Sequence, residues 1–416
     1  MMRNHALRAS LSEEMHVRRL PRLSAPCRLM QIITLTGEGG GEASRAHMDA
    51  LAQGSRAIVP VAAKYGVIAV DGFTLVWERH TEFVSHTLIR EGPYDAPFDE
   101  ALFEPLLSRI LADLPGDVIR ATQIAFAPRD RPEPSAEERD RWFSSEATVV
   151  CDVASGGARI MSDFRLHDDG YGRLLVLDRD LALDEPAQLL MRLQELGNYR
   201  NMALLGLPLA QRLTPRVSEL EARLAELTGA VSERTSQDDE LLDELTFLSA
   251  ELARIVAETR YRMSATRAYA QLSTDRLASL HIGLVRGHQT LADFTERRLT
   301  PAVRTCDSFS ARLEDLSQRA AWTSELLRTR IDTALAKQNT VLLASMDRRT
   351  EVQLRLQQTV EGLSVVAISY YLVALIAYVI GAVPGLSYKV AMAAVVPLVL
   401  TIVALSLMRV QRKLHE

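Results

Sequence analysis

The chain has 416 residues, of which 47% are hydrophobic and 24% are charged, and its formal net charge at pH 7 is −5. That length allows two or three structural units. The slightly acidic balance argues against a general nucleic-acid binder, which needs a basic face. Cys27, Cys151 and Cys306 lie far apart and match no zinc or redox spacing, so we expect buried free thiols in a reducing compartment.

Residues 1–184 are predicted to form an α+β domain. Short runs rich in β-branched and aromatic residues, bounded by Gly, Pro and Asp, are typical of strands. The predicted strands are Leu29–Leu35, Gly72–Arg79, Glu82–Arg90, Val118–Ala127, Ala147–Val153, Ala158–Leu166 and Gly172–Asp178. Helices are predicted between them at Glu42–Gln53, Phe98–Leu111 and Glu137–Phe143. The order of the strands stays open.

A candidate metal site lies in the segment Trp77–Phe83, where Glu78, His80 and Glu82 alternate with other residues. On a strand, side chains two residues apart point to the same face. Two carboxylates beside an imidazole can hold a divalent cation or transfer protons. The alternative is an ordinary solvated strand face above a packed apolar one.

Residues 185–361 show a helical pattern in place of strands. Apolar residues recur at spacings of three and four, which indicates helices that pack along a narrow apolar seam as a coiled coil or bundle. We expect this stalk to form a homo-oligomer. The polar stretch Ser232–Asp239 is either a turn or a polar notch. The seam residues are Val217, Leu220, Leu224, Leu227, Val231, Leu241, Leu245, Leu248, Leu252, Ile255, Phe309, Leu313, Leu316, Leu327, Ile331, Leu335, Leu342 and Met346.

Residues 362–416 contain two apolar segments without charged residues, Leu363–Val383 and Val390–Met408. Each is about as long as the roughly 20 residues that a helix needs to cross a bilayer. Positive residues flank the pair, which predicts that both ends are cytoplasmic. The first 35 residues lack a continuous apolar run, so no signal peptide is expected. Lipid headgroups are the expected partners of Arg348, Arg349, Arg409, Arg412 and Lys413.

A polar stripe enters the first apolar segment. Glu361, Ser364, Tyr371 and Tyr378 recur at helical spacing and so share one helix face. Ionisable and hydroxyl groups on one face of a membrane helix usually point into a bundle or a wet cavity. These residues are therefore candidates for lining a membrane entry or pore. The alternative is an interfacial anchor, with Glu361 at the headgroups and tyrosines that only pack.

Several motifs resemble a bacterial family of predicted membrane-anchored proteins known only as a domain of unknown function. The resemblance covers nearly the whole chain and implies a cytoplasmic region with a C-terminal membrane anchor, without an assigned activity. The family usually has proline where this chain has Ala6 and Arg19. The motifs are His5–Arg8, Glu14–His16, Glu78–Phe83, Asp163–Arg165, Tyr199–Arg200, Met202–Leu205, Arg297–Leu299, Gln338–Asn339, Ala344–Arg349 and Gln353–Tyr371.

The predicted architecture is also similar to that of CorA-type divalent-cation channels. Those channels carry a Gly-Met-Asn motif at the end of the first span, where this chain has Gly381-Ala-Val-Pro-Gly385. A likeness of architecture alone is a weak argument for function.

The sequence therefore favours a non-catalytic, oligomeric scaffold or sensor in the bacterial inner membrane, with both termini cytoplasmic. The alternatives are a CorA-like oligomeric cation transporter and a metal-dependent enzyme in the N-terminal domain. The lipid bilayer and further copies of the chain are the expected partners, nucleic acid is not one, and any cofactor or small ligand stays unknown.

Overall fold

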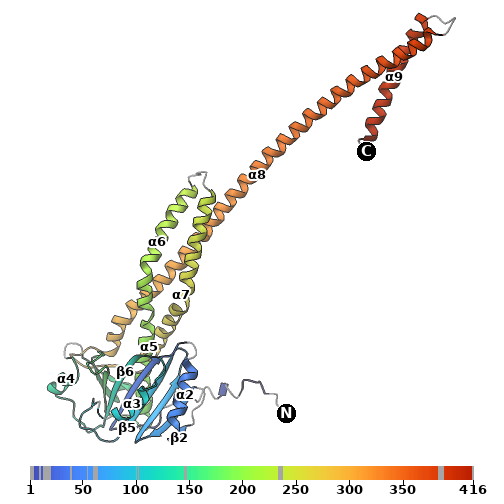
Figure 1. Ribbon diagram of the computed structural model, residues 1–416. Coiled ribbons are helices and arrows are strands. Elements are labelled where there is room, and N and C mark those ends of the chain that lie inside the picture. Colours follow the sequence, from blue (N-terminus) through green and yellow to red (C-terminus); the bar gives the residue numbers. More distant parts are fainter. Residues whose placement is uncertain are drawn as a thin grey trace. The chain divides into compact units, whose positions relative to one another are not determined.

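Figure 1 shows the computed structural model of the chain. The structure describes residues 4–8, 11–12, 20–37, 40–53, 55–59, 64–99, 101, 103–144, 148–232, 238–382 and 388–414. The chain divides into two compact units. The first comprises Met1–Arg234 and Asp239–Trp322, and the second comprises Thr235–Asp238 and Thr323–Glu416.

A ten-stranded sheet is the centre of the first unit, in the order β10-β7-β8-β9-β6-β1-β5-β4-β3-β2. Among the described residues, β6 and β9 pair in parallel and the other neighbours pair antiparallel. The strands are β1 (Cys27–Leu35), β2 (Arg56–Val59), β3 (Tyr65–Val70), β4 (Phe73–Arg79), β5 (Phe83–Glu91), β6 (Asp117–Ala127), β7 (Val149–Val153), β8 (Ala158–Ser162), β9 (Gly172–Asp178) and β10 (Gly283–Leu284).

Side chains along a strand alternate between the two faces of the sheet. Both faces carry apolar side chains, and helices cover both. Helices α2 (Gly40–Ala52) and α3 (Glu104–Leu111) bury Met48 and Ile110 against one face. Helix α5 (Glu185–Leu204) buries Leu189, Leu190, Leu193 and Leu196 against the other. The short helix α4 (Ala136–Trp142) is capped at Ser135 by a capping box with Glu138.

Three long helices complete the first unit, namely α6 (Gly206–Ser232), α7 (Asp238–Ser279) and the start of α8 (Leu291–Gly381). The predicted seam is buried from Val217 to Leu227 on α6, from Leu241 to Ile255 on α7, and at Phe309, Leu313 and Leu316 on α8. Ion pairs such as Arg223–Glu244 and Arg312–Glu221 join neighbouring helices. Because α6 ends at Ser232 and α7 begins at Asp238, the polar stretch separates two helices; residues 233–237 are outside the described set.

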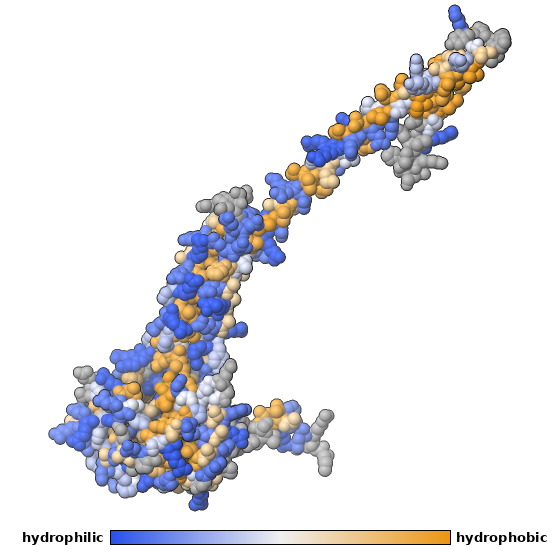
Figure 2. All heavy atoms as spheres, in the orientation of Figure 1, coloured by the Kyte–Doolittle hydropathy of each residue, from blue (hydrophilic) through white to orange (hydrophobic). Residues whose placement is uncertain are grey.

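The second unit contains the rest of α8 and the helix α9 (Tyr388–Leu414). Every residue from Asp332 to Val360 is exposed. Farther along, Ser369 on α8 and Val399 and Val403 on α9 are buried. Both helices are long and apolar enough to cross a membrane, as predicted. Figure 2 shows hydrophobic residues gathered over α9 and the end of α8.

The predicted α+β domain, long helices and paired apolar segments are all present, and the seven predicted strands correspond to β1 and β4–β9. Strand β8 ends at Ser162, four residues before the predicted end, because the backbone turns at Phe164 with φ of 52°. Helix α3 begins at Glu104 and not at Phe98, with a proline in its first turn. Strands β2, β3 and β10 were missed; β2 is fully exposed and β10 has two residues.

Candidate functional site

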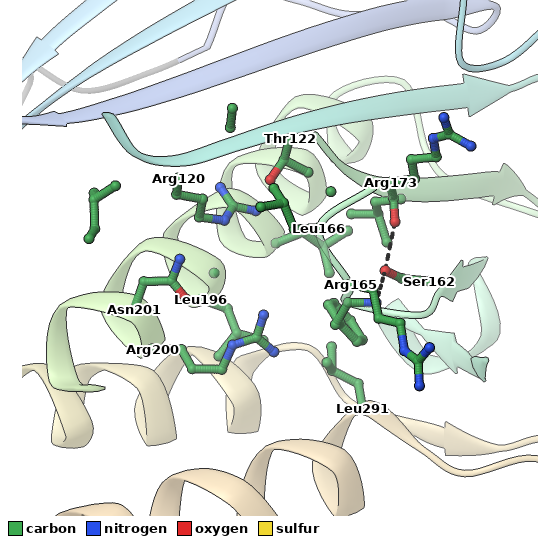
Figure 3. Close-up of a pocket in the computed structure, with 17 residues that line it drawn as sticks. Arg120, Thr122, Ser162, Arg165, Leu166, Arg173, Leu196, Arg200, Asn201 and Leu291 are labelled. Carbon is green, nitrogen blue, oxygen red and sulfur yellow. Dashed lines mark hydrogen bonds between the residues drawn. The ribbon is translucent and has the colours of Figure 1, made fainter. Parts of the chain in front are cut away.

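A pocket of about 260 Å³ lies between α5 and residues of the strands β6, β8 and β9 (Figure 3). Leu291, the first residue of α8, also lines it. All of its lining residues belong to the first unit. They are Ile119, Arg120, Ala121, Thr122, Ser162, Phe164, Arg165, Leu166, Gly172, Arg173, Leu174, Leu193, Leu196, Gly197, Arg200, Asn201 and Leu291.

Arg120 enters the pocket from β6. Its Nη1 donates hydrogen bonds to Gln31 Oε1 at 2.6 Å and to Asn198 Oδ1 at 2.9 Å. Both acceptors are neutral amides, so they orient the guanidinium without offsetting its charge. Burial, and then the positive charge of Arg200, lower the pKa of Arg120 to about 9. The guanidinium is therefore held in a place that disfavours its charge.

Arg200 enters the same pocket from α5. Its guanidinium carbon lies 4.7 Å from the ring centre of Phe164 and 5.5 Å from that of Phe294, as in cation–π contacts. Such contacts hold the planar group without using its N–H donors. Nη1 of Arg200 is buried and has no hydrogen-bond partner. Burial, and then the charge of Arg298, lower the pKa of Arg200 to about 10.

The described residues that line the pocket include four arginines and no Asp or Glu. Arg173 is paired, with Nη2 donating to Asp169 Oδ2 at 2.7 Å. Within the described part of the chain, no carboxylate lies within ion-pair distance of Arg120 or Arg200. Buried charges are normally paired, because desolvation without a partner is costly. The arrangement therefore has the chemistry of an anion-binding site.

The loop after β8 forms one wall of the pocket and is held by its own hydrogen bonds. Ser162 Oγ donates to the carbonyl of Arg173 at 2.6 Å and accepts from the backbone N–H of Phe164 at 3.1 Å. The buried carboxylate of Asp163 accepts from the backbone N–H of Ser144 at 2.9 Å and of Arg165 at 3.2 Å. In Figure 3, Arg165 turns away from Arg120 and Arg200. The wall that presents Phe164 to Arg200 is thus ordered before any ligand binds.

Sequence reasoning did not find this site, although Arg200 belongs to a motif quoted for the family resemblance. A local signal exists for each arginine. Arg120 lies inside a predicted strand, and Arg200 follows Leu193 and Leu196 by seven and four residues, on the buried face of α5. What the sequence could not show is that the two side chains meet, because that requires the packing of α5 on β6.

The candidate metal residues are placed differently from the strand that was expected. Strand β4 ends at Arg79 and β5 begins at Phe83, so the hairpin turn separates Glu78 from Glu82. Glu78 Oε2 lies 3.9 Å from His80 Nε2, whereas Glu82 faces α7 and accepts two hydrogen bonds from Arg262, at 2.9 and 3.0 Å. The described residues contain no group of three or more His, Cys, Asp and Glu that could hold a metal ion. Metal binding here stays a prediction.

Of the candidate membrane-entry residues on α8, Glu361 and Ser364 are half-buried and the two tyrosines are exposed. The carboxylate of Glu361 accepts a hydrogen bond from Gln357 Nε2 at 3.0 Å, and Ser364 Oγ donates to the carbonyl of Val360 at 2.7 Å. Tyr371 and Tyr378 are 69% and 85% exposed, whereas the nearby Ser369 is buried. The exposed end of the stripe, at Tyr371 and Tyr378, is therefore distinct from the position that α8 buries at Ser369.

The candidate headgroup-binding residues lie on α8 before the first apolar segment and on α9 after the second. Arg348 and Arg349 on α8 and Arg409 on α9 are exposed. Arg412 and Lys413 belong to α9, but their side chains lie outside the described part of the structure.

Comparison with known proteins gives a family but no activity. The family model described as "Protein of unknown function (DUF3422)" matches residues 3–414. No curated protein matches the sequence. Among solved structures, the chain is similar to the CorA magnesium transporter from Methanocaldococcus jannaschii at 11% identity and a TM-score of 0.18, over 82% of this chain and 99% of that one; a likeness this weak carries no argument. The family match spans nearly the whole sequence, and the chain belongs to the DUF3422 family of proteins of unknown function.

Proposed function

We propose that this protein is a membrane-anchored, non-catalytic sensor that binds a small anion between Arg120 and Arg200. The observation that carries the proposal is the pair of deeply placed guanidinium groups that share a pocket and have no carboxylate facing them. Each has its pKa lowered by burial, so an anion that entered would offset an existing electrostatic cost. Binding would thereby stabilise the folded state.

The pocket supports binding better than catalysis. Its described lining contains no His, Cys, Lys, Asp or Glu, which are the usual general bases and, with Ser and Thr, the usual nucleophiles. The hydroxyl of Ser162 already donates one hydrogen bond and accepts another within the wall. Thr122 has no His, Lys or carboxylate beside it in the lining that would activate it. A bound ligand would be held by charge and shape without being converted.

The membrane anchor is proposed to be the pair of apolar segments in α8 and α9, with both of its ends in the cytoplasm. Support comes from their length and hydropathy and from the arginines that flank them. The helix that supplies Leu291 to the pocket is also the helix that contains the first apolar segment. A protease should remove a tag appended to the C-terminus only in inverted vesicles; its removal in right-side-out vesicles would refute this orientation.

Self-association is proposed to use the exposed part of α8. Leu335, Leu342 and Met346 are 52%, 60% and 57% exposed, and their spacing places them on one face of the helix. Apolar side chains exposed along one face favour a partner that covers them, and a second copy presents the same face.

Anion binding can be tested by thermal unfolding of the full-length protein in detergent, in a buffer of low ionic strength, with added phosphate, sulfate or organic acids. We expect at least one anion to raise the Tm by several degrees at saturation. Arg200→Gln should abolish the rise. Arg304→Gln, which removes an exposed arginine of α8 outside the pocket, should keep it. The proposal fails if no anion shifts the Tm of the wild type, or if Arg200→Gln responds like the wild type.

A further inference from the structure

The apolar walls of the pocket point to the chemical class of its ligand. We infer that the site takes a small organic acid with one carboxylate head and a short apolar body, and not an inorganic anion. This inference rests on the proposed function, because it assumes that the pocket binds an anion at Arg120 and Arg200. It concerns what the rest of the ligand must be.

Apolar side chains form much of the pocket lining beside the arginines. Leu174, Leu193, Leu196 and Leu291 are buried and line the pocket, together with Phe164, whose ring lies under Arg200. An inorganic anion has no apolar part with which to contact these walls. An apolar body that covers them gains affinity, by about fourfold for each methylene group that is buried.

One apolar residue marks the rim of the pocket. Leu166 lines it but is 76% exposed, which is unusual for a leucine whose neighbours in the lining are buried. In Figure 3, Leu166 lies between Thr122 and Arg165 on the loop after β8. A ligand that extends from the arginines toward the rim would cover it.

The free donor of Arg200 suits a carboxylate head. Nη1 of Arg120 already serves two amide oxygens, whereas Nη1 of Arg200 is unpartnered. A carboxylate has two oxygens and matches the edge of a single guanidinium. In this arrangement Arg200 donates to the carboxylate, and Arg120 adds a second positive charge beside it.

The volume limits the length of the ligand. At about 260 Å³ the pocket is smaller than the roughly 300–1,000 Å³ that is typical of sites for drug-sized ligands. Acids with a body of a few carbon atoms fit that limit.

The test is calorimetric titration of the full-length protein in detergent with acetate, butanoate, hexanoate and inorganic phosphate. Binding of the same acids to Arg200→Gln is subtracted, so that partition into micelles is removed. We expect the affinity to rise from acetate to hexanoate by about fourfold per buried methylene, and hexanoate to bind more tightly than phosphate. Leu166→Ser should lower the affinity for hexanoate and leave that for acetate unchanged. Leu183→Ser, at a residue that is 82% exposed and outside the pocket, is the matched control.

The outcomes separate the two proposals. Phosphate that binds as tightly as hexanoate, or an affinity that does not change with chain length, overturns the ligand class while leaving an anion sensor. If none of the anions binds, the ligand class and the proposed function both fall.

Discussion

Gly197 on α5 lies directly against the guanidinium of Arg120 on β6. A Cβ atom at residue 197 would be 2.6 Å from Arg120 Nη2 and 2.7 Å from Cζ, closer than such atoms approach. A glycine in the interior of a helix costs stability relative to alanine. Here the glycine makes room for the guanidinium of Arg120. A residue that weakens the helix therefore lies at the candidate site.

Gly197→Ala should therefore displace Arg120 and weaken anion binding. We expect a loss of tenfold or more in the affinity for hexanoate, measured by calorimetry, because Arg120 can move only by giving up the hydrogen bonds to Gln31 and Asn198. Gly229→Ala on α6, where a new Cβ meets nothing within 4 Å, is the control. It should leave binding unchanged and raise stability by about 0.5–1 kcal/mol. Equal binding by both variants would show that the position of Arg120 does not matter.

The ion pair between Glu82 and Arg262 should stabilise the first unit. Their side chains are only 12% and 17% exposed, and the two hydrogen bonds join the β4–β5 turn to α7. Burial, and then Glu82, raise the pKa of the nearby Tyr269. Glu82→Gln should lower the free energy of unfolding by about 2–3 kcal/mol, somewhat less than for a fully buried pair.

The control for that experiment is Glu219→Gln, which removes the partner of Arg216 in an exposed pair on α6. Urea unfolding should show a loss below about 1 kcal/mol for this variant. Similar losses for the two variants would mean that the Glu82–Arg262 pair contributes no more than a surface pair does.

Stability should fall in mild acid because of His86. Its ring is buried on β5, neither ring nitrogen has a hydrogen-bond partner, and burial, followed by repulsion from His47, lowers its pKa to about 3. An unfolded histidine has a pKa of about 6.5. Between these values the unfolded state binds more protons, so the stability is complete above about pH 6.5 and is lost as the pH falls.

From pH 7.5 to pH 5 the expected loss is about 2 kcal/mol from this residue, read from urea unfolding followed by tryptophan fluorescence. His86→Phe should flatten the dependence on pH over this range. If the variant kept the slope of the wild type, groups other than His86 would have to account for it.

The proposed self-association predicts a specific pattern of crosslinking. Leu342→Cys places a thiol on the exposed apolar face of α8, and Ala344→Cys places one about 200° around the helix. In membranes under mild oxidation, Leu342→Cys should form a disulfide between two copies and Ala344→Cys should not. The wild-type cysteines provide the background, since all three are buried. Equal crosslinking at both positions would contradict a defined interface.

Local patterns in the sequence were sufficient for the elements whose burial is regular. The runs of β-branched and aromatic residues in β4 and β5, the helical period of the seam from Val217 to Ile255 and the length of the two apolar segments are each visible in the local sequence. Strand β2 was not predicted, because all four of its residues are exposed and no alternation of buried and exposed side chains marks it. Contacts between residues far apart in the sequence could not be predicted for a different reason. The pairing of Glu82 with Arg262 joins residues 180 positions apart, and no local spacing records it.

The central claim is that a small acid binds with its carboxylate on Arg200. Crystals of the full-length protein soaked with 6-bromohexanoate test it most directly, because anomalous scattering locates the bromine. The account predicts a carboxylate within about 3 Å of Arg200 Nη1 and the bromine toward Leu166 at the rim. An empty pocket with a carboxylate side chain of the protein paired to Arg200 would contradict it.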